Sequence, residues 1–151
     1  MKNTVLIISI AIFQFFGQAL FAQEKAGSHV SMDAYLVHVE EDVHELIVEV
    51  GIRNGWLIFV EVPADLPFQT AKLCVDLPLG VECLGDLEQE NVQIIDNDSD
   101  VLMSGFGIIF KQKIKCNELP DEGQISCKMI YQACNRVIYT PVIMDETYID
   151  L

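Results

Sequence analysis

Residues 106–116 read FGIIFKQKIKC, and this stretch decides the fold class. Its apolar side chains occupy every second position, and Lys111, Lys113 and Lys115 stand between them. Such an alternation is typical of a β-strand with one buried and one exposed face. The one polar residue in the apolar row is Gln112. The row itself consists of Phe106, Ile108, Phe110, Ile114 and Cys116. The stretch therefore predicts an amphipathic strand.

A turn and a returning strand follow this segment. Residues 117–123 contain proline, aspartate and glycine, which are residue types that favour turns. Residues 125–134 then form the returning strand. Its apolar face consists of Ile125, Cys127, Met129 and Tyr131. Cys134 has the opposite parity, so an unbroken strand would point its sulfur toward the polar side.

Further outward, short apolar segments alternate with turn residues. Asn54-Gly55 lies between the segments 46–52 and 56–62, and it predicts a hairpin because both residues tolerate a positive φ. Pro78-Leu79-Gly80 predicts a second turn. The remaining expected strands are 73–77, 81–84, 92–95, 137–139 and 142–149. No stretch has a helical period, so about eight or nine short strands predict an all-β protein, a single-domain antiparallel β-sandwich.

Composition excludes two broad classes of protein. The chain has 151 residues, of which 51% are hydrophobic and 21% charged, and this excludes a disordered chain. Nine Lys and Arg against 23 Asp and Glu give a formal net charge of −14. Phosphate contacts need clustered cations, so we expect no nucleic-acid partner.

The N-terminus has the order of a secretory signal peptide. Lys2 precedes an apolar run from Val5 to Phe16, and Ala19-Leu20-Phe21-Ala22 then offers a small residue before Gln23. We expect a signal peptide over 1–22, a linker over 23–32 and one domain over 33–151, exported to the periplasm or secreted. An uncleaved N-terminal anchor is the alternative, although the run is short for a membrane span. No integral membrane segment is expected after cleavage.

Five cysteines remain in the exported part, where disulfides persist. They are Cys74, Cys83, Cys116, Cys127 and Cys134. An odd number leaves at least one thiol without an intramolecular partner. Cys116 and Cys127 lie symmetrically about the 120–123 turn, and Cys74 and Cys83 lie symmetrically about Pro78-Leu79, so each pair is a candidate disulfide. Buried free thiols are the alternative, because free cysteine packs as a small hydrophobe.

Cys134 is the candidate reactive thiol. It lies at a strand end on the polar parity, and reactivity depends on the fraction of thiolate. The nearby Arg136 would favour the thiolate, while the net negative charge of the chain opposes it.

Residues 129–142, MIYQACNRVIYTPV, resemble the active-site strand of the N-terminal periplasmic domain of DsbD-type thiol:disulfide interchange proteins. In that family Tyr-Gln-x-Cys is followed by a second cysteine and then by proline. Here Tyr131, Gln132 and Cys134 match, and Pro141 fits the proline. Residues 54–59 and 106–115 resemble two further strands of the family, in the family's order.

The resemblance implies an immunoglobulin-like sandwich and a role in electron relay. In the family, the domain receives electrons from a membrane-embedded partner and passes them to thioredoxin-like periplasmic proteins. One thiolate attacks a partner disulfide and a second cysteine resolves the mixed disulfide. Here the expected second position falls near Tyr139, and a phenol cannot resolve a mixed disulfide. The leading hypothesis is therefore an exported, degenerate domain of this type with one active-site thiol, Cys134.

Other patterns predict little chemistry. Asp96, Asp98 and Asp100 resemble the start of a calcium loop, but Val101 stands where glycine is required, so a solvated turn is favoured. His38 and His44 flank three acidic residues without a metal-ligand spacing, which favours a polar loop. The lysine stripe at 111–115 is interpreted as a solvated face, with docking of an acidic partner as the alternative.

Two further classes of function stay open. A non-catalytic immunoglobulin-like binding module of the cell envelope would keep the sandwich and bind a protein through an edge or loop. A purely structural envelope domain is the third possibility. No cofactor and no metal are predicted for any of the three.

Overall fold

The computed structural model describes residues 28–96, 100–116 and 123–151, with side chains described outside 91–96. Nine strands and no helix are found in these ranges. The strands are β1 (Val30–Glu40), β2 (Val43–Ile52), β3 (Leu57–Glu61), β4 (Lys72–Asp76), β5 (Glu82–Asp96), β6 (Leu102–Lys115), β7 (Gln124–Tyr131), β8 (Ala133–Cys134) and β9 (Ile143–Asp150). Within the described ranges there is thus no helix that could span a membrane.

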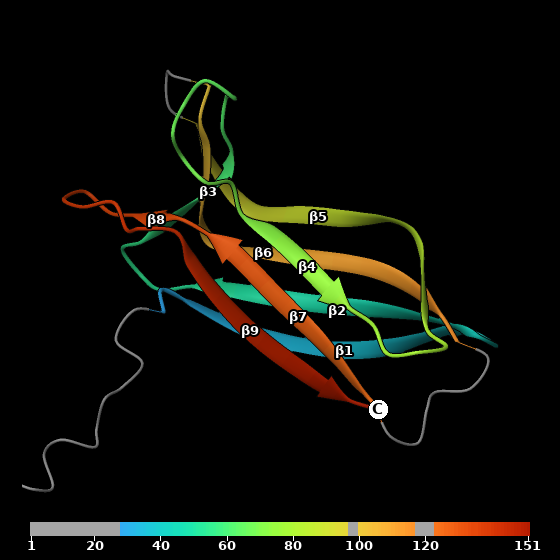
Figure 1. Cartoon of the computed structure of the whole chain (residues 1–151). Helices are drawn as coiled ribbons and strands as arrows, with labels where there is room; N and C mark the ends of the chain where they lie inside the picture. Colours follow the sequence, from blue (N-terminus) through green and yellow to red (C-terminus); the bar gives the residue numbers. More distant parts are fainter. Residues whose placement is uncertain (1–27, 97–99, 117–122) are drawn as a thin grey trace, which may run out of the picture.

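The strands form two antiparallel sheets. The larger sheet has the order β1-β2-β6-β3-β8, and β5 pairs with the remaining edge of β6. The smaller sheet has the order β4-β7-β9 and lies across the larger one (Figure 1). The predicted all-β class is confirmed, and the architecture is an immunoglobulin-like β-sandwich.

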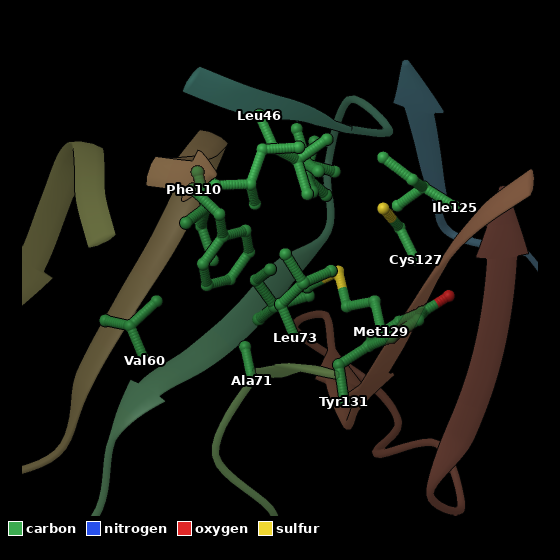
Figure 2. Packing of buried hydrophobic residues seen from close by; sticks show 14 of the residues in the cluster. Leu46, Val60, Ala71, Leu73, Phe110, Ile125, Cys127, Met129 and Tyr131 are labelled. Atoms are coloured by element: carbon green, nitrogen blue, oxygen red, sulfur yellow. The ribbon is translucent and has the colours of Figure 1, made fainter. Parts of the chain in front are cut away.

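The core lies between the two sheets. From β6, Ile108, Phe110 and Ile114 are at most 1% exposed. The facing row of β7 is fully buried at 0% exposure and consists of Ile125, Cys127, Met129 and Tyr131. Figure 2 shows Leu46 and Phe110 of the larger sheet directed toward Cys127 and Met129 of the smaller one. The two alternating rows predicted from the sequence therefore form the facing layers of the core.

Gln112 interrupts the apolar row of β6 without being left unpaired. Its Nε2 donates to the carbonyl oxygens of Leu84, Gly85 and Lys113 at 3.0–3.3 Å. The first two carbonyls belong to a register shift in β5 between Leu84 and Glu88. The amide thus satisfies backbone groups that a regular ladder would have paired.

The predicted hairpin at Asn54-Gly55 is wrong. β2 and β3 both pair antiparallel with the same edge of β6, so the chain continues in one direction through residues 53–56. The Trp56 N–H donates to the Arg53 carbonyl at 3.0 Å. Only Gly55 has a positive φ, whereas the hairpin-forming type I′ turn needs positive φ at both central residues. The turn therefore interrupts one long strand and does not reverse it.

The two other predicted turns connect the sheets and do not form hairpins. β4 and β5 belong to different sheets, and Gly80, with φ +87°, lies in the corner between them. β6 and β7 also belong to different sheets. Proline and glycine predict a change of chain direction, but they do not predict which strand the following segment pairs with.

Three strands differ in extent from the predictions. β1 was missed, and it forms a hairpin with β2 through Glu41-Asp42, in the segment interpreted as a polar loop. The predicted strands 81–84 and 92–95 are one strand, β5. Residues 137–139 contribute only an isolated bridge at Tyr139. The signal peptide, residues 23–27 of the linker, and parts of the calcium-like loop and of the 117–123 turn lie outside the described residues.

Candidate functional site

Cys134 lies where the chain crosses from one sheet to the other. β7 ends at Tyr131 in the smaller sheet, and β8 then pairs with β3 of the larger sheet, with Cys134 opposite Leu57. The predicted unbroken strand over 125–134 is therefore wrong. The chain leaves the smaller sheet at Gln132. The alternation of faces along β7 therefore does not predict the side-chain direction of Cys134. Its side chain is 5% exposed and buried, contrary to the prediction.

Cys134 belongs to a second, smaller apolar cluster at the end of the sandwich. The buried members of this cluster are Phe59, Val101, Met103 and Cys134. The Cys134 sulfur lies 3.8 Å from Met103 Sδ. Cys134 also forms part of the wall of a pocket of about 450 Å³, together with Asn135 and Arg136. Cys134 is thus buried among apolar side chains and also lines a pocket.

Three stacked aromatic rings, one of them the buried Phe59, lie along the pocket side of this cluster. The Phe59 and Phe68 ring centroids are 4.8 Å apart, and the Phe68 and Tyr139 centroids are 5.5 Å apart. All three rings line the pocket that contains Cys134. Phe68 comes from the segment between β3 and β4, where no periodic pattern exists, so its role could not be predicted from the sequence.

Gln132 joins the segments that carry two of these rings. Its Oε1 accepts a hydrogen bond from the Gln69 N–H at 3.0 Å, and its Nε2 donates to the Thr140 carbonyl at 2.8 Å. Gln69 follows Phe68, and Thr140 follows Tyr139. The glutamine of the Tyr-Gln-x-Cys motif therefore positions the rings of the Cys134 pocket from both sides.

Tyr131 lies in the main core and not in the smaller cluster around Cys134. Its ring is fully buried in the main core, and its hydroxyl donates to Asp145 Oδ2 on β9 at 2.8 Å. The Ser28 hydroxyl donates to the same carboxylate oxygen at 2.9 Å. Burial and the bond to Asp145 raise the pKa of Tyr131 to about 12. Tyr131 thus fixes β9 and the start of β1 below the site and does not reach Cys134.

Tyr139 lies across from Cys134. The two residues form an antiparallel bridge, and the Thr140 N–H donates to the Ala133 carbonyl at 2.8 Å. The hairpin between them projects from the end of the sandwich (Figure 1). Tyr139 is 63% exposed, and Pro141 is also exposed. A side chain with no sulfur therefore occupies the position that directly faces Cys134 across the hairpin.

The environment of Cys134 favours the neutral thiol. Burial raises its pKa above the ordinary value. Burial is the cause of this shift, and Arg136, although it follows two residues later, is exposed. A group with this pKa contains little thiolate at neutral pH, and thiolate is the reactive form.

The other cysteines are free thiols in the structure, as is Cys134. The hairpins on which the two disulfides were predicted do not exist, since β6 and β7, and likewise β4 and β5, lie in different sheets. Cys74 and Cys83 are exposed. Cys116 and Cys127 are buried in the core, and burial raises the pKa of Cys127 to about 11.

The remaining polar patterns have structural partners. His38 and His44 face each other across the β1–β2 hairpin with ring centroids 5.2 Å apart. Among the described residues no group of three His, Cys, Asp or Glu side chains is placed to hold a metal ion. Of the lysine stripe, Lys111 pairs with Glu90 at 2.7 Å and Lys115 with Asp42 at 3.1 Å.

No protein-family model and no curated protein sequence matches this chain. Solved structures do match it. The N-terminal periplasmic domain of ScsB from Proteus mirabilis has a TM-score of 0.51 and 12% identity, and the alignment covers 83% of this chain and 47% of that one. The chain folds like the ScsB domain. It spans about half of that domain's length.

Two further structures are similar at a lower score. The reduced N-terminal domain of DsbD from Neisseria meningitidis has a TM-score of 0.42 and 15% identity, with 89% of this chain and 92% of that one covered. The GAE domain of yeast GGA1 has a TM-score of 0.47 and 15% identity, with 83% and 93% covered. At these identities the likeness concerns the fold alone. The similarity to the ScsB domain supports, at the level of the fold, the resemblance stated from the sequence.

Proposed function

We propose that this chain is an exported domain related to thiol:disulfide interchange domains, with Cys134 as the single thiol of its site. The observation that carries the proposal is the position of Cys134 and Tyr139 of the family-like segment in the wall of one pocket, with Gln132 hydrogen-bonded to the residue after Tyr139. The ScsB domain with the same fold is periplasmic, which agrees with the signal-like residues 1–22. The expected partner is a thioredoxin-like protein or a membrane-embedded redox protein.

The chemistry available to one thiol is the formation of a mixed disulfide. Cys134 loses its proton to solvent, and the resulting thiolate attacks one sulfur of a partner disulfide. A bond forms between Cys134 Sγ and that sulfur, while the partner's other sulfur leaves as a thiolate. Because Tyr139 faces Cys134, resolution falls to the partner's own thiol, which reverses the reaction, or to a third thiol. The domain would therefore capture a partner and not complete an electron relay.

A thiol-trapping experiment tests this proposal. The reduced Cys74→Ser/Cys83→Ser protein, which lacks the two exposed thiols and serves as the reference for the variants below, is incubated with a thioredoxin-like protein in its disulfide form, and the mixture is separated without reductant. We expect a 1:1 adduct that requires Cys134 and disappears on reduction. Cys127→Ala is the matched control, since Cys127 lies in the closed core and should leave the adduct unchanged. An adduct of equal yield with Cys134→Ser, or none with the reference protein, would contradict the proposal.

The second candidate is a non-catalytic binding module. The raised pKa and 5% exposure of Cys134 favour it, because both slow attack on a disulfide. Under this alternative, partner capture survives Cys134→Ser and is insensitive to reductant. Measuring capture by the reference protein and by this variant, each with and without dithiothreitol, separates the two functions.

A further inference from the structure

The two arginines of the chain line two adjoining pockets next to the projecting hairpin. Arg136 lines a pocket of about 510 Å³, and Arg53 lines one of about 360 Å³. Ile52 and Phe106 belong to the walls of both pockets, so the two hollows form one trough. Cys134 lines neither of them.

Phe106 is the central apolar feature of this trough. The sequence placed it in the buried row of β6, but it is 63% exposed. β2 pairs with β6 as far as Gly107 and β3 begins again at Ser104, so no partner strand from this side covers residues 105–106. The Ser104 hydroxyl donates to the Gly107 carbonyl at 2.8 Å and closes the irregular segment. The interruption of the long strand thus turns a phenylalanine outward.

Trp56 supplies a second apolar wall. Its ring stacks on His29 with the centroids 3.7 Å apart, so the indole is held in place on one side. Leu57 lines the same pocket as Trp56. The trough therefore offers fixed aromatic and aliphatic surface to a ligand side chain, with an arginine in each pocket.

Neither arginine has an acidic partner among the described residues. Both side chains are exposed, and neither forms an ion pair in the part of the chain that the structure describes. By contrast Lys111, Lys115 and Lys128 all do. In a chain of formal net charge −14, two arginines left without a carboxylate are available to an external one. The planar guanidinium group binds carboxylates through two parallel hydrogen bonds.

We propose that this trough is a docking site for an extended acidic segment of a partner protein. The segment would place an aromatic or aliphatic side chain against Phe106 and Trp56, and its carboxylates would pair with Arg53 and Arg136. The hairpin directly after Arg136 extends the apolar surface, since Val137 is 86% and Ile138 51% exposed. This continuity favours a protein segment over a small acid. The proposal does not depend on thiol chemistry at Cys134.

Fluorescence anisotropy with a defined peptide tests the site. The probe is a labelled peptide of glycine and serine with blocked ends and a central phenylalanine between two aspartates. We expect saturable binding in reducing buffer, weakened at least roughly tenfold by Arg53→Ala or Arg136→Ala, because each change removes a charge-assisted hydrogen-bonding group. Phe106→Ala should also weaken binding, and higher salt should weaken it further.

Matched controls decide the outcome. Lys72→Ala removes an exposed cation from β4 in the other sheet and should leave the affinity unchanged. A peptide with lysines in place of the aspartates should not bind, and melting curves confirm that each variant is folded. Equal binding by the lysine peptide or by the Arg53→Ala/Arg136→Ala double variant would overturn the proposal, as would no saturation at millimolar peptide. Competition by phenylacetate at equal affinity would overturn the protein segment in favour of a small acid.

Discussion

Cys127 and Cys134 are seven residues apart and both are buried, yet they lie in unlike surroundings. Cys127 is in the middle of β7, at 0% exposure, inside the closed core between the sheets (Figure 2). Cys134 is in the smaller cluster beyond the end of β7, and it also lines a pocket. Burial raises the pKa of both thiols. Burial alone therefore does not distinguish the two cysteines; the pocket that Cys134 lines does.

The largest expected difference between the two clusters is in stability. Phe110→Ala leaves a cavity in the closed core and should lower the free energy of unfolding by about 3 to 5 kcal/mol. Phe68→Ala removes one ring from the partly exposed stack and should cost only about 1 kcal/mol. Urea denaturation of the two variants measures both values. Equal losses would mean that the end cluster is as tightly packed as the core.

The next largest expected difference between the closed core and the smaller cluster is in the pH dependence of stability. Cys127 has an ordinary pKa of 9.0 and a folded-state pKa of about 11, so its neutral form stabilises the folded state fully below pH 9. As pH rises from 9 to 11 that contribution disappears, and about 2 to 3 kcal/mol should be lost through this group. The difference between native protein and Cys127→Ala in urea melts at pH 8 and pH 11 isolates it. An identical loss in the variant would show that other groups carry the effect.

Gln132 tests whether the rings of the Cys134 pocket are positioned by the hydrogen bonds described above. Gln132→Ala removes both and should lower stability by about 1 to 2 kcal/mol. It should also speed modification of Cys134 by a thiol reagent, with Cys127 protected in the same sample. Gln132→Glu keeps the acceptor for the Gln69 N–H but loses the donor to Thr140, so an intermediate effect is expected. No change in the labelling rate would argue that the rings are held by their packing alone.

The smallest expected change in the free energy of unfolding is at Cys134. Cys134→Ala should change the free energy of unfolding by less than about 1 kcal/mol, because the space it leaves opens into an existing pocket and is not a closed cavity. Thermal melts of Cys134→Ala and Cys127→Ala make the comparison direct. A larger loss at Cys134 than at Cys127 would reverse the distinction between the two clusters.

The sequence was informative where one strand stays in one sheet. The alternation in 108–116 and 125–131 predicted the facing rows of the core, because a period of two needs only local geometry. It failed at Phe106, at Asn54-Gly55 and at Cys134 for one shared reason. At each of these places strand pairing is interrupted or its partner changes, and the pairing is set by contacts between segments distant in the sequence.

The site residues divide in the same way. The Tyr-Gln-x-Cys resemblance located the segment that holds Gln132 and Cys134, and it put Tyr139 near the position expected for a second cysteine; in the structure Tyr139 forms a bridge with Cys134. The roles of Phe68 and Met103 depend on loop packing and on a neighbouring strand. Neither carries a local pattern, so only the folded chain brings them to Cys134.

The short length of β8 has a consequence for the motions of the molecule. Two residues hold this strand to β3, whereas β7 pairs with β9 along eight positions. Strands with few hydrogen bonds open by local fluctuation, while long central ones open only with the whole domain. Amide hydrogen exchange should therefore be faster at Ala133 and Thr140 than at Cys127 and Met129. The end of the sandwich that carries Cys134 can then open and close many times during the lifetime of a single folded core.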